Sequence, residues 1–122
     1  MQTSTLVSVV DDDEAVRDSL PDLLRSFGYE AEPFSSAEEF LASDHLDRTA
    51  CLVLDIAMPG MTGPHLQQEL ARRRRPIPIV FITAHSDEMM FPKLLGQGAV
   101  ACLTKPFSEA EIVEAVNTAL VR

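Results

Sequence analysis

The chain has 122 residues, of which 46% are hydrophobic and 24% are charged, so one domain with its own core is expected over residues 1–122. Nineteen acidic residues against ten basic ones give a formal net charge of −9. This charge argues against direct binding of nucleic acid by these residues, because phosphate backbones require clustered cations. The first ten residues contain no Lys or Arg to begin a signal peptide, and no stretch approaches the ~18 apolar residues of a membrane span. We therefore expect a cytoplasmic domain without membrane contact.

Apolar runs and amphipathic segments alternate from the start of the chain. Residues 6–10 are a β-branched apolar run, which predicts a buried strand. Apolar residues then recur every three or four positions over 16–27, as in a helix, and Gly28 provides a stop. Residues 30–34 predict a second, weaker strand, and a capping box at Ser36 opens another helix.

The same alternation continues to the end of the chain. Further strands are predicted at 51–54, 77–83 and 99–103. Three helices are predicted beside them: one that carries Leu66 and Leu70, one placed loosely around 89–95, and one that follows Ser108. Within the helix around 89–95, Pro92 costs ~3 kcal/mol and Gly96 ~1 kcal/mol in a helix interior. We expect that helix to be short, to begin near Pro92, or to be mobile. Five apolar strands separated by helices imply an α/β domain with one parallel sheet covered on both faces.

Polar side chains follow the predicted strands at the points where the strands end. Asp11 and Asp12 come after the first strand, Asp55 after the third, Thr83 at the end of the fourth, and Lys105 after the fifth. Because the carboxyl ends of parallel strands meet at one edge of a sheet, we expect these groups to lie together. Three closely packed carboxylates repel one another, and this repulsion raises the pKa of at least one of them.

A hard divalent cation would relieve this repulsion. Oxygen ligands without His or Cys suit Mg²⁺. With Lys105 as a second positive group and Thr83 as a hydroxyl donor, the set describes acyl-phosphate formation on Asp55. Taken alone, each residue has an ordinary structural explanation. Acidic residues after Val10 are favourable at the start of a helix, and Asp55 is typical of a turn. The hypothesis depends on their joint occurrence at successive strand ends.

Four stretches of the chain carry a family resemblance. Residues 9–13 (VVDDD), 54–63 (LDIAMPGMTG), 81–84 (FITA) and 103–107 (LTKPF) resemble, in order and spacing, the signature stretches of the receiver domain of two-component response regulators. The likeness covers essentially the whole chain and is greatest to the FixJ-type transcriptional regulators. It implies a flavodoxin-like, doubly wound, five-stranded parallel sheet of order 2-1-3-4-5 with about five helices.

The resemblance also implies roles for the acidic residues. Asp55 matches the position of the phosphoacceptor. Asp12 and Asp55 match direct ligands of Mg²⁺, Asp11 matches a ligand that acts mostly through water, and the backbone carbonyl of Ala57 supplies another ligand. The metal site is therefore expected to be Asp11, Asp12, Asp55 and Ala57.

Three further positions match the family's switching machinery, and a fourth departs from it. Lys105 matches the lysine that pairs with the phosphoryl group, and the Lys105–Pro106 bond is expected to be cis. Thr83 matches the threonine that moves to bond the phosphoryl oxygen. The family's pattern has an aromatic ring three residues before the lysine, where this chain has Cys102. A thiol cannot fill the volume of a ring, so a small core residue is the plain interpretation of Cys102, and redox sensing is the alternative.

The function implied is that of a signalling receiver. Asp55 would take a phosphoryl group from a sensor histidine kinase in a Mg²⁺-dependent reaction, and the domain would catalyse only its own phosphorylation and dephosphorylation rather than act as an enzyme. Phosphorylation would switch the face made by the fourth helix, fifth strand and fifth helix, a candidate homodimer surface. By resemblance the output is transcription, through a DNA-binding domain outside this chain.

Two alternatives stay open at this point. One is a phosphorylation-independent protein-interaction module on the same fold, which Cys102 and Pro92 favour and the complete acidic site opposes. The other is an enzyme on the same fold, such as a phosphatase with an aspartate nucleophile. An enzyme would need a substrate pocket and a second acid or base, and a chain this short offers no spare segment for a lid.

Overall fold

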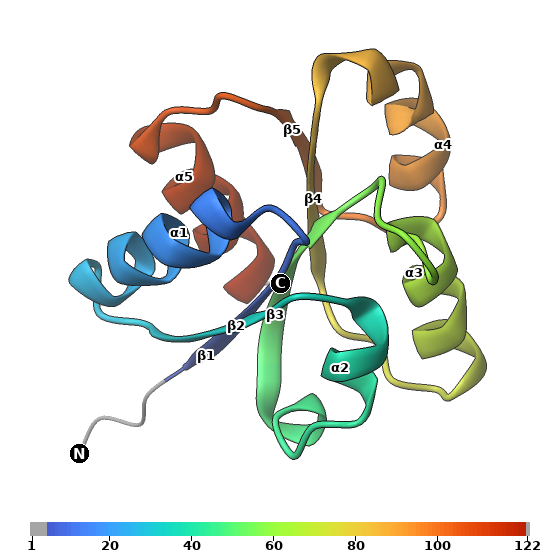
Figure 1. Cartoon of the computed structure of the whole chain (residues 1–122), viewed down its shortest axis with the longest axis horizontal. Helices are drawn as coiled ribbons and strands as arrows, with labels where there is room; N and C mark the ends of the chain where they lie inside the picture. Colours follow the sequence, from blue (N-terminus) through green and yellow to red (C-terminus); the bar gives the residue numbers. More distant parts are fainter. Residues whose placement is uncertain (1–4, 122) are drawn as a thin grey trace.

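The computed structural model describes residues 5–121 apart from the side chain of His85, so residues 1–4 and 122 of the expected domain lie outside it. It shows a sheet between two layers of helices (Figure 1). The elements in chain order are β1 (Leu6–Val10), α1 (Glu14–Ser26), β2 (Glu30–Phe34), α2 (Ala37–Leu41), the 3₁₀ helix η1 (Leu46–Arg48), β3 (Thr49–Asp55), α3 (Gly63–Arg72), β4 (Ile79–Thr83), the 3₁₀ helix η2 (His85–Met90), α4 (Phe91–Gly96), β5 (Ala101–Thr104) and α5 (Glu109–Leu120).

The five strands are parallel and lie in the order β2-β1-β3-β4-β5, which confirms the predicted sheet. β2 is an edge strand, and it tolerates Pro33 because an edge can do without one ladder hydrogen bond. The strand order reverses direction at β1 and β3, where Val10 pairs with Leu54. A crevice for ligands forms at such a reversal, beyond the carboxyl ends of the two strands.

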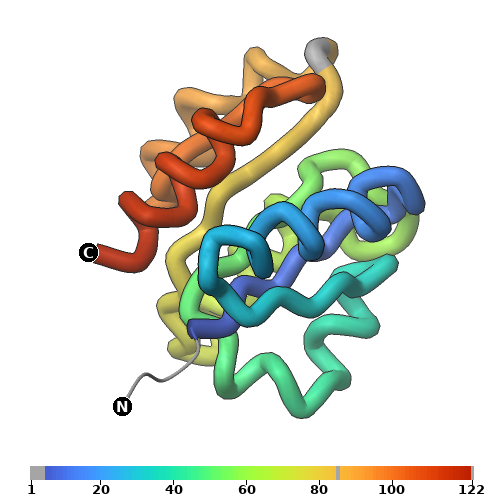
Figure 2. Tube along the Cα trace, turned by 90° about the vertical axis from the view of Figure 1, so that its left-hand side faces the viewer, coloured from blue at the N-terminus to red at the C-terminus, as the bar shows by residue number. Residues whose placement is uncertain are grey.

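Two apolar layers cover the sheet. Residues such as Leu24, Val53 and Ile112 join α1 and α5 to one face, and Figure 2 shows these two helices in front of the strands. Residues such as Phe40 and Leu54 belong to the other layer, beneath α2, α3 and α4. Because neighbouring residues of β3 are buried on opposite faces, its sequence is a continuous apolar run rather than an alternating one.

The helix expected around 89–95 is α4, which is short and has Pro92 in its first turn. Proline is tolerated there because its missing N–H is not needed in a first helical turn. The preceding residues form η2 instead, which confirms that a regular α-helix does not run into Pro92 from Asp87. No helix within residues 5–121 combines the length and apolar character needed to cross a membrane.

Gly63 holds the loop after β3 close to the start of α3. Its N–H donates to the carbonyl oxygen of Ile56 at 2.9 Å. A Cβ atom at this position would lie 2.3 Å from the carbonyl oxygen of Asp55, well inside contact distance. Only glycine therefore lets the backbone that carries Asp55 fold back on α3.

We predict that Gly63→Ala destabilises the protein by about 2 kcal/mol, because the clash is with backbone that cannot rotate away. Gly96→Ala is the matched control, since a Cβ there meets nothing within 4 Å. It should leave stability unchanged or raise it by up to about 1 kcal/mol through helix propensity. Urea unfolding followed by circular dichroism measures both; equal midpoints for the two variants would contradict the packing argument.

Candidate functional site

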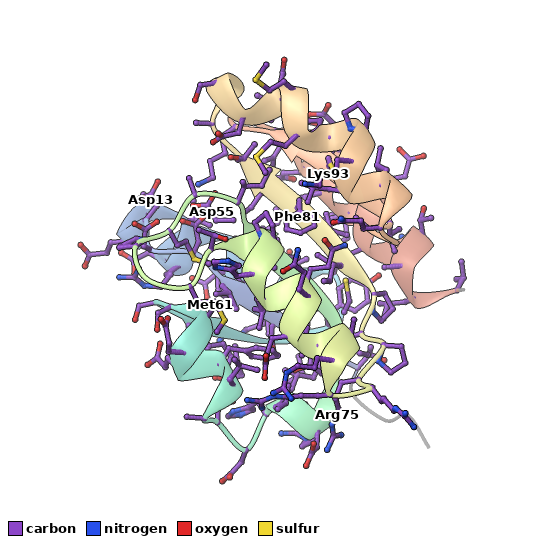
Figure 3. The ribbon with its side chains drawn as sticks, turned by 90° about the vertical axis from the view of Figure 1, so that its right-hand side faces the viewer. Asp13, Asp55, Met61, Arg75, Phe81 and Lys93 are labelled. Atoms are coloured by element: carbon purple, nitrogen blue, oxygen red, sulfur yellow. The ribbon has the colours of Figure 1, made fainter. Side chains whose placement is uncertain are left out.

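Three carboxylates meet at the crevice beyond β1 and β3. Asp11 is fully buried and Asp55 is 6% exposed, whereas Asp12 is exposed to solvent. One carboxylate oxygen from each lies within 4.8 Å of the others. Figure 3 shows Asp55 at one end of α3, with Arg75 at the other. The structure thus brings together the three acids that the sequence placed at strand ends.

The buried carboxylate of Asp11 has two partners. Its Oδ1 accepts the N–H of Asp13 at 2.9 Å, and Asp13 in turn caps α1 through the N–H of Ala15. Its Oδ2 lies 2.8 Å from Nζ of Lys105, an ion pair at the centre of the site. The same ammonium lies 3.8 Å from Oδ2 of Asp55. Lys105 is therefore shared between two acids and is only 23% exposed.

Burial and like charge act together on Asp55. Desolvation of its carboxyl group, with the nearby charge of Asp11, raises the pKa of Asp55 to about 7, although Lys105 opposes the rise. For Lys105, burial alone would lower the pKa, but contact with Asp11 outweighs it and the pKa of Lys105 is raised. Lys105 therefore stays charged, and its one charge does not offset the acids around it.

The donor set fits a hard divalent cation. The three acids offer oxygen atoms only, at a spacing that one ion can bridge. Ala57 follows in the loop after β3 and is exposed. Burial, together with the charge of Asp11, raises the pKa of Asp55 to about 7, and a cation among the carboxylates would offset both the desolvation and the repulsion. These residues suit Mg²⁺ better than a metal that prefers nitrogen or sulfur.

Thr83 ends β4 beside this cluster. Asp55 on β3 pairs with Ile82, so Thr83 lies one residue further toward the crevice. Its backbone carbonyl accepts the N–H of Lys105 at 2.7 Å, and the Lys105–Pro106 peptide bond is cis. The turn at Pro106, which follows β5, thus begins beside the end of β4 that carries Thr83.

Two acidic residues of η2 contact the site's threonines, and the sequence did not predict them. The hydroxyl of Thr83, itself fully buried, donates to Oδ2 of Asp87 at 3.0 Å. The hydroxyl of Thr104, which pairs with Thr83 across the ladder, donates to Oε2 of Glu88 at 2.6 Å. The four-residue spacing from Thr83 to Asp87 is the one signal that could have suggested the first contact.

Glu38 was also not predicted. Its carboxylate accepts the N–H of Met61 at 3.0 Å and so ties the loop after β3 to α2. Its place in the first turn of α2 suggests only a favourable charge at a helix start, so the sequence carries no signal for this contact.

Cys102 lies away from the carboxylates. It pairs with Phe81 across the β4–β5 ladder and packs against the layer that contains Leu94. Burial raises the pKa of the Cys102 thiol to about 11, which disfavours the reactive thiolate. The structure thus shows a small, partly buried residue at position 102 that packs against this apolar layer. His85, two residues after Thr83, has its side chain outside the described part of the chain.

Comparison with known proteins agrees with this geometry. The family model described as "Response regulator receiver domain" matches residues 7–117. Nodulation protein W of Bradyrhizobium diazoefficiens is 47% identical over 98% of this chain and 53% of its own length. The transcriptional regulatory protein FixJ of Azorhizobium caulinodans is 41% identical over 100% of this chain and 58% of its own.

Solved structures give the same fold. The crystal structure titled FixJ-N superposes with a TM-score of 0.88 at 35% identity, covering 99% of this chain and 97% of that one. The response regulator StyR gives 0.90 at 44% identity, over 98% of this chain and 60% of that one. The chain spans about half the length of the curated relatives that it matches. It belongs to the response regulator receiver domain family.

Proposed function

We propose that this domain is a switch of two-component signalling that accepts a phosphoryl group on Asp55 from a sensor histidine kinase. The observation that carries the proposal is the carboxylate of Asp55, 6% exposed, beside two other acids and 3.8 Å from the ammonium of Lys105. Relatives named as response regulator and transcriptional regulatory proteins support a transcriptional output. The DNA-binding part would then lie outside these residues.

The chemistry follows from the positions of the side chains. A carboxylate oxygen of Asp55 attacks phosphorus, and the bond from phosphorus to the donor's histidine nitrogen breaks with its electron pair on nitrogen. Lys105 supplies positive charge beside the incoming phosphoryl oxygens. A bound Mg²⁺, held by Asp11, Asp12, Asp55 and the carbonyl of Ala57, would neutralise further negative charge at this point. Because the domain modifies only itself, its role is that of a signalling protein.

The surface that would respond is formed by α4, β5 and α5, and η2 lies directly before α4 in the chain. Met89 on η2 is 85% exposed and Leu95 on α4 is 45% exposed, so each of these two elements presents a large apolar side chain to solvent. Such side chains suit a partner or a second copy of the chain, and we propose that a homodimer forms here after phosphorylation.

Intact mass after incubation with acetyl phosphate and Mg²⁺ tests the proposal directly. Wild-type protein should gain one phosphoryl group, and Asp55→Ala should gain none, because the nucleophile is gone. Asp44→Ala removes an exposed acid from the loop after α2 and should behave as wild type. A folded wild-type protein that neither gains the group nor binds beryllofluoride would favour the phosphorylation-independent interaction module.

A second prediction concerns pH and Mg²⁺. Since the pKa of Asp55 is raised in the folded state, its stabilising contribution is present below its ordinary pKa of 3.8 and is lost as pH rises through about 7. In EDTA, the free energy of unfolding should fall by about 2–3 kcal/mol from about pH 5 to about pH 8 through this group. Mg²⁺ should restore that loss above about pH 7, since it binds the folded carboxylates.

Urea unfolding across this pH range, with and without Mg²⁺, measures the effect. Asp55→Asn should flatten the fall and remove most of the Mg²⁺ gain, because the group that titrates is replaced by a neutral amide. Asp44→Asn is the charge-matched control and should keep the wild-type profile. Identical pH profiles for Asp55→Asn and wild type would show that another group causes the fall.

A further inference from the structure

The hydroxyl of Thr83 has two acceptors that compete for its single proton. Thr83 carries a single O–H, and in the structure that O–H donates to Oδ2 of Asp87 at 3.0 Å. Under the proposed function, the same O–H must donate to a phosphoryl oxygen on Asp55. A single O–H cannot serve both acceptors, so the first bond has to break when the second forms.

The burial of Thr83 makes this exchange costly. Its side chain is fully buried, at 0% exposed, so solvent does not satisfy its hydroxyl when Asp87 is lost. Asp87 is only partly buried and can be rehydrated once released. A hydrogen bond to a charged acceptor is also stronger than one between neutral groups. The unphosphorylated state is therefore favoured by a bond that the phosphorylated state must give up.

We propose that Asp87 is a positioning residue that holds Thr83 away from the phosphoryl site and sets how readily the domain switches. This role rests on the proposed phosphorylation of Asp55. Asp87 acts through Thr83 and does not itself contact the reacting atoms. A weaker acceptor at residue 87 shifts the domain toward the conformation that binds a phosphoryl group.

The same bond connects the site to the surface. Asp87 belongs to η2, and its N–H donates to the carbonyl of Ala84 at 3.1 Å. The next residue, Glu88, is bonded to Thr104 at 2.6 Å, so η2 is attached to two neighbouring strands by consecutive acids. When Thr83 turns away, η2 loses the attachment to β4 and keeps the one to β5. Met89, at 85% exposure, lies on the segment whose attachment changes.

The test measures the affinity for beryllofluoride, a mimic of the phosphoryl group, in the presence of Mg²⁺ by titration of backbone amide NMR signals. Asp87→Ala should bind about tenfold more tightly than wild type, the size expected from losing one charge-assisted hydrogen bond in the free state. Asp44→Ala should bind as wild type does. Unchanged or weaker binding by Asp87→Ala would overturn the positioning role.

A double-mutant cycle with Thr83→Val separates the hydrogen bond from the simple loss of a negative charge. Valine keeps the shape of threonine but has no hydroxyl, so in that background Asp87→Ala should change the affinity by less than about twofold. An equal gain in both backgrounds would mean that Asp87 acts only through its charge, and the proposal would fail.

Amide hydrogen exchange of residues 84–90 in the free protein adds a readout that needs no anion. Asp87→Ala and Thr83→Val should each speed exchange there, and the two together should exchange no faster than either alone. Additive effects on the exchange rate would show that the two residues do not share a hydrogen bond.

If wild-type protein bound no beryllofluoride at all, the proposed function would fail. If wild type bound it and Asp87→Ala matched wild type, only the role of Asp87 would fail.

Discussion

The ion pair between Lys105 and the buried Asp11 is the constraint on which the rest of the site depends. A fully buried carboxylate is costly unless a charge and hydrogen bonds compensate it, and Lys105 is the cation that does so here. β1 and β5 are separated in the sheet by β3 and β4. The side chain of Lys105, which follows β5, therefore reaches across the ends of both intervening strands to Asp11. Those strand ends carry Asp55 and Thr83. The pair that stabilises Asp11 therefore also fixes the groups between which a phosphoryl group would sit.

The positive charge of Lys105 does not balance the acids of the site, and this imbalance belongs to the chemistry proposed for it. Asp55 is buried, and one lysine does not offset the acids beside it, so the pKa of Asp55 stays raised. An apolar residue at that position would avoid the penalty, at the loss of the chemistry, and such local conflicts are typical of functional sites. Gly63 differs from Asp55 in this respect, because the backbone there is packed too closely for any side chain and glycine is the residue that stability requires.

Much of the fold could be predicted because both faces of the sheet are buried. The strands at residues 6–10 and 30–34 coincide with β1 and β2. The prediction for β3 began at Cys51 instead of Thr49, because Thr49 is a polar residue in a buried strand. Its hydroxyl lies 2.7 Å from that of Ser8, a cross-strand pair that no hydrophobic pattern reveals. The carboxylate cluster was predictable from strand ends, whereas the contact of Asp87 was not, since a six-residue 3₁₀ segment is too short for a residue pattern to show where its side chains point.

Cys102 makes the contact between Asp87 and Thr83 more important. A switch that relies on a ring turning into the space left by a moving threonine needs an aromatic residue, and the thiol packed beside Phe81 is too small to fill that space. The two hydroxyl–carboxylate bonds to η2 need no such ring. They join adjacent strands to adjacent residues of one short segment, so a change at Thr83 alters how that segment is held whatever occupies position 102. Because α4 starts only at Phe91, η2 is not the first turn of a long helix and can shift without breaking one. Under the role proposed for Asp87, the link from the acidic site to the surface therefore runs through the side-chain carboxylates of η2.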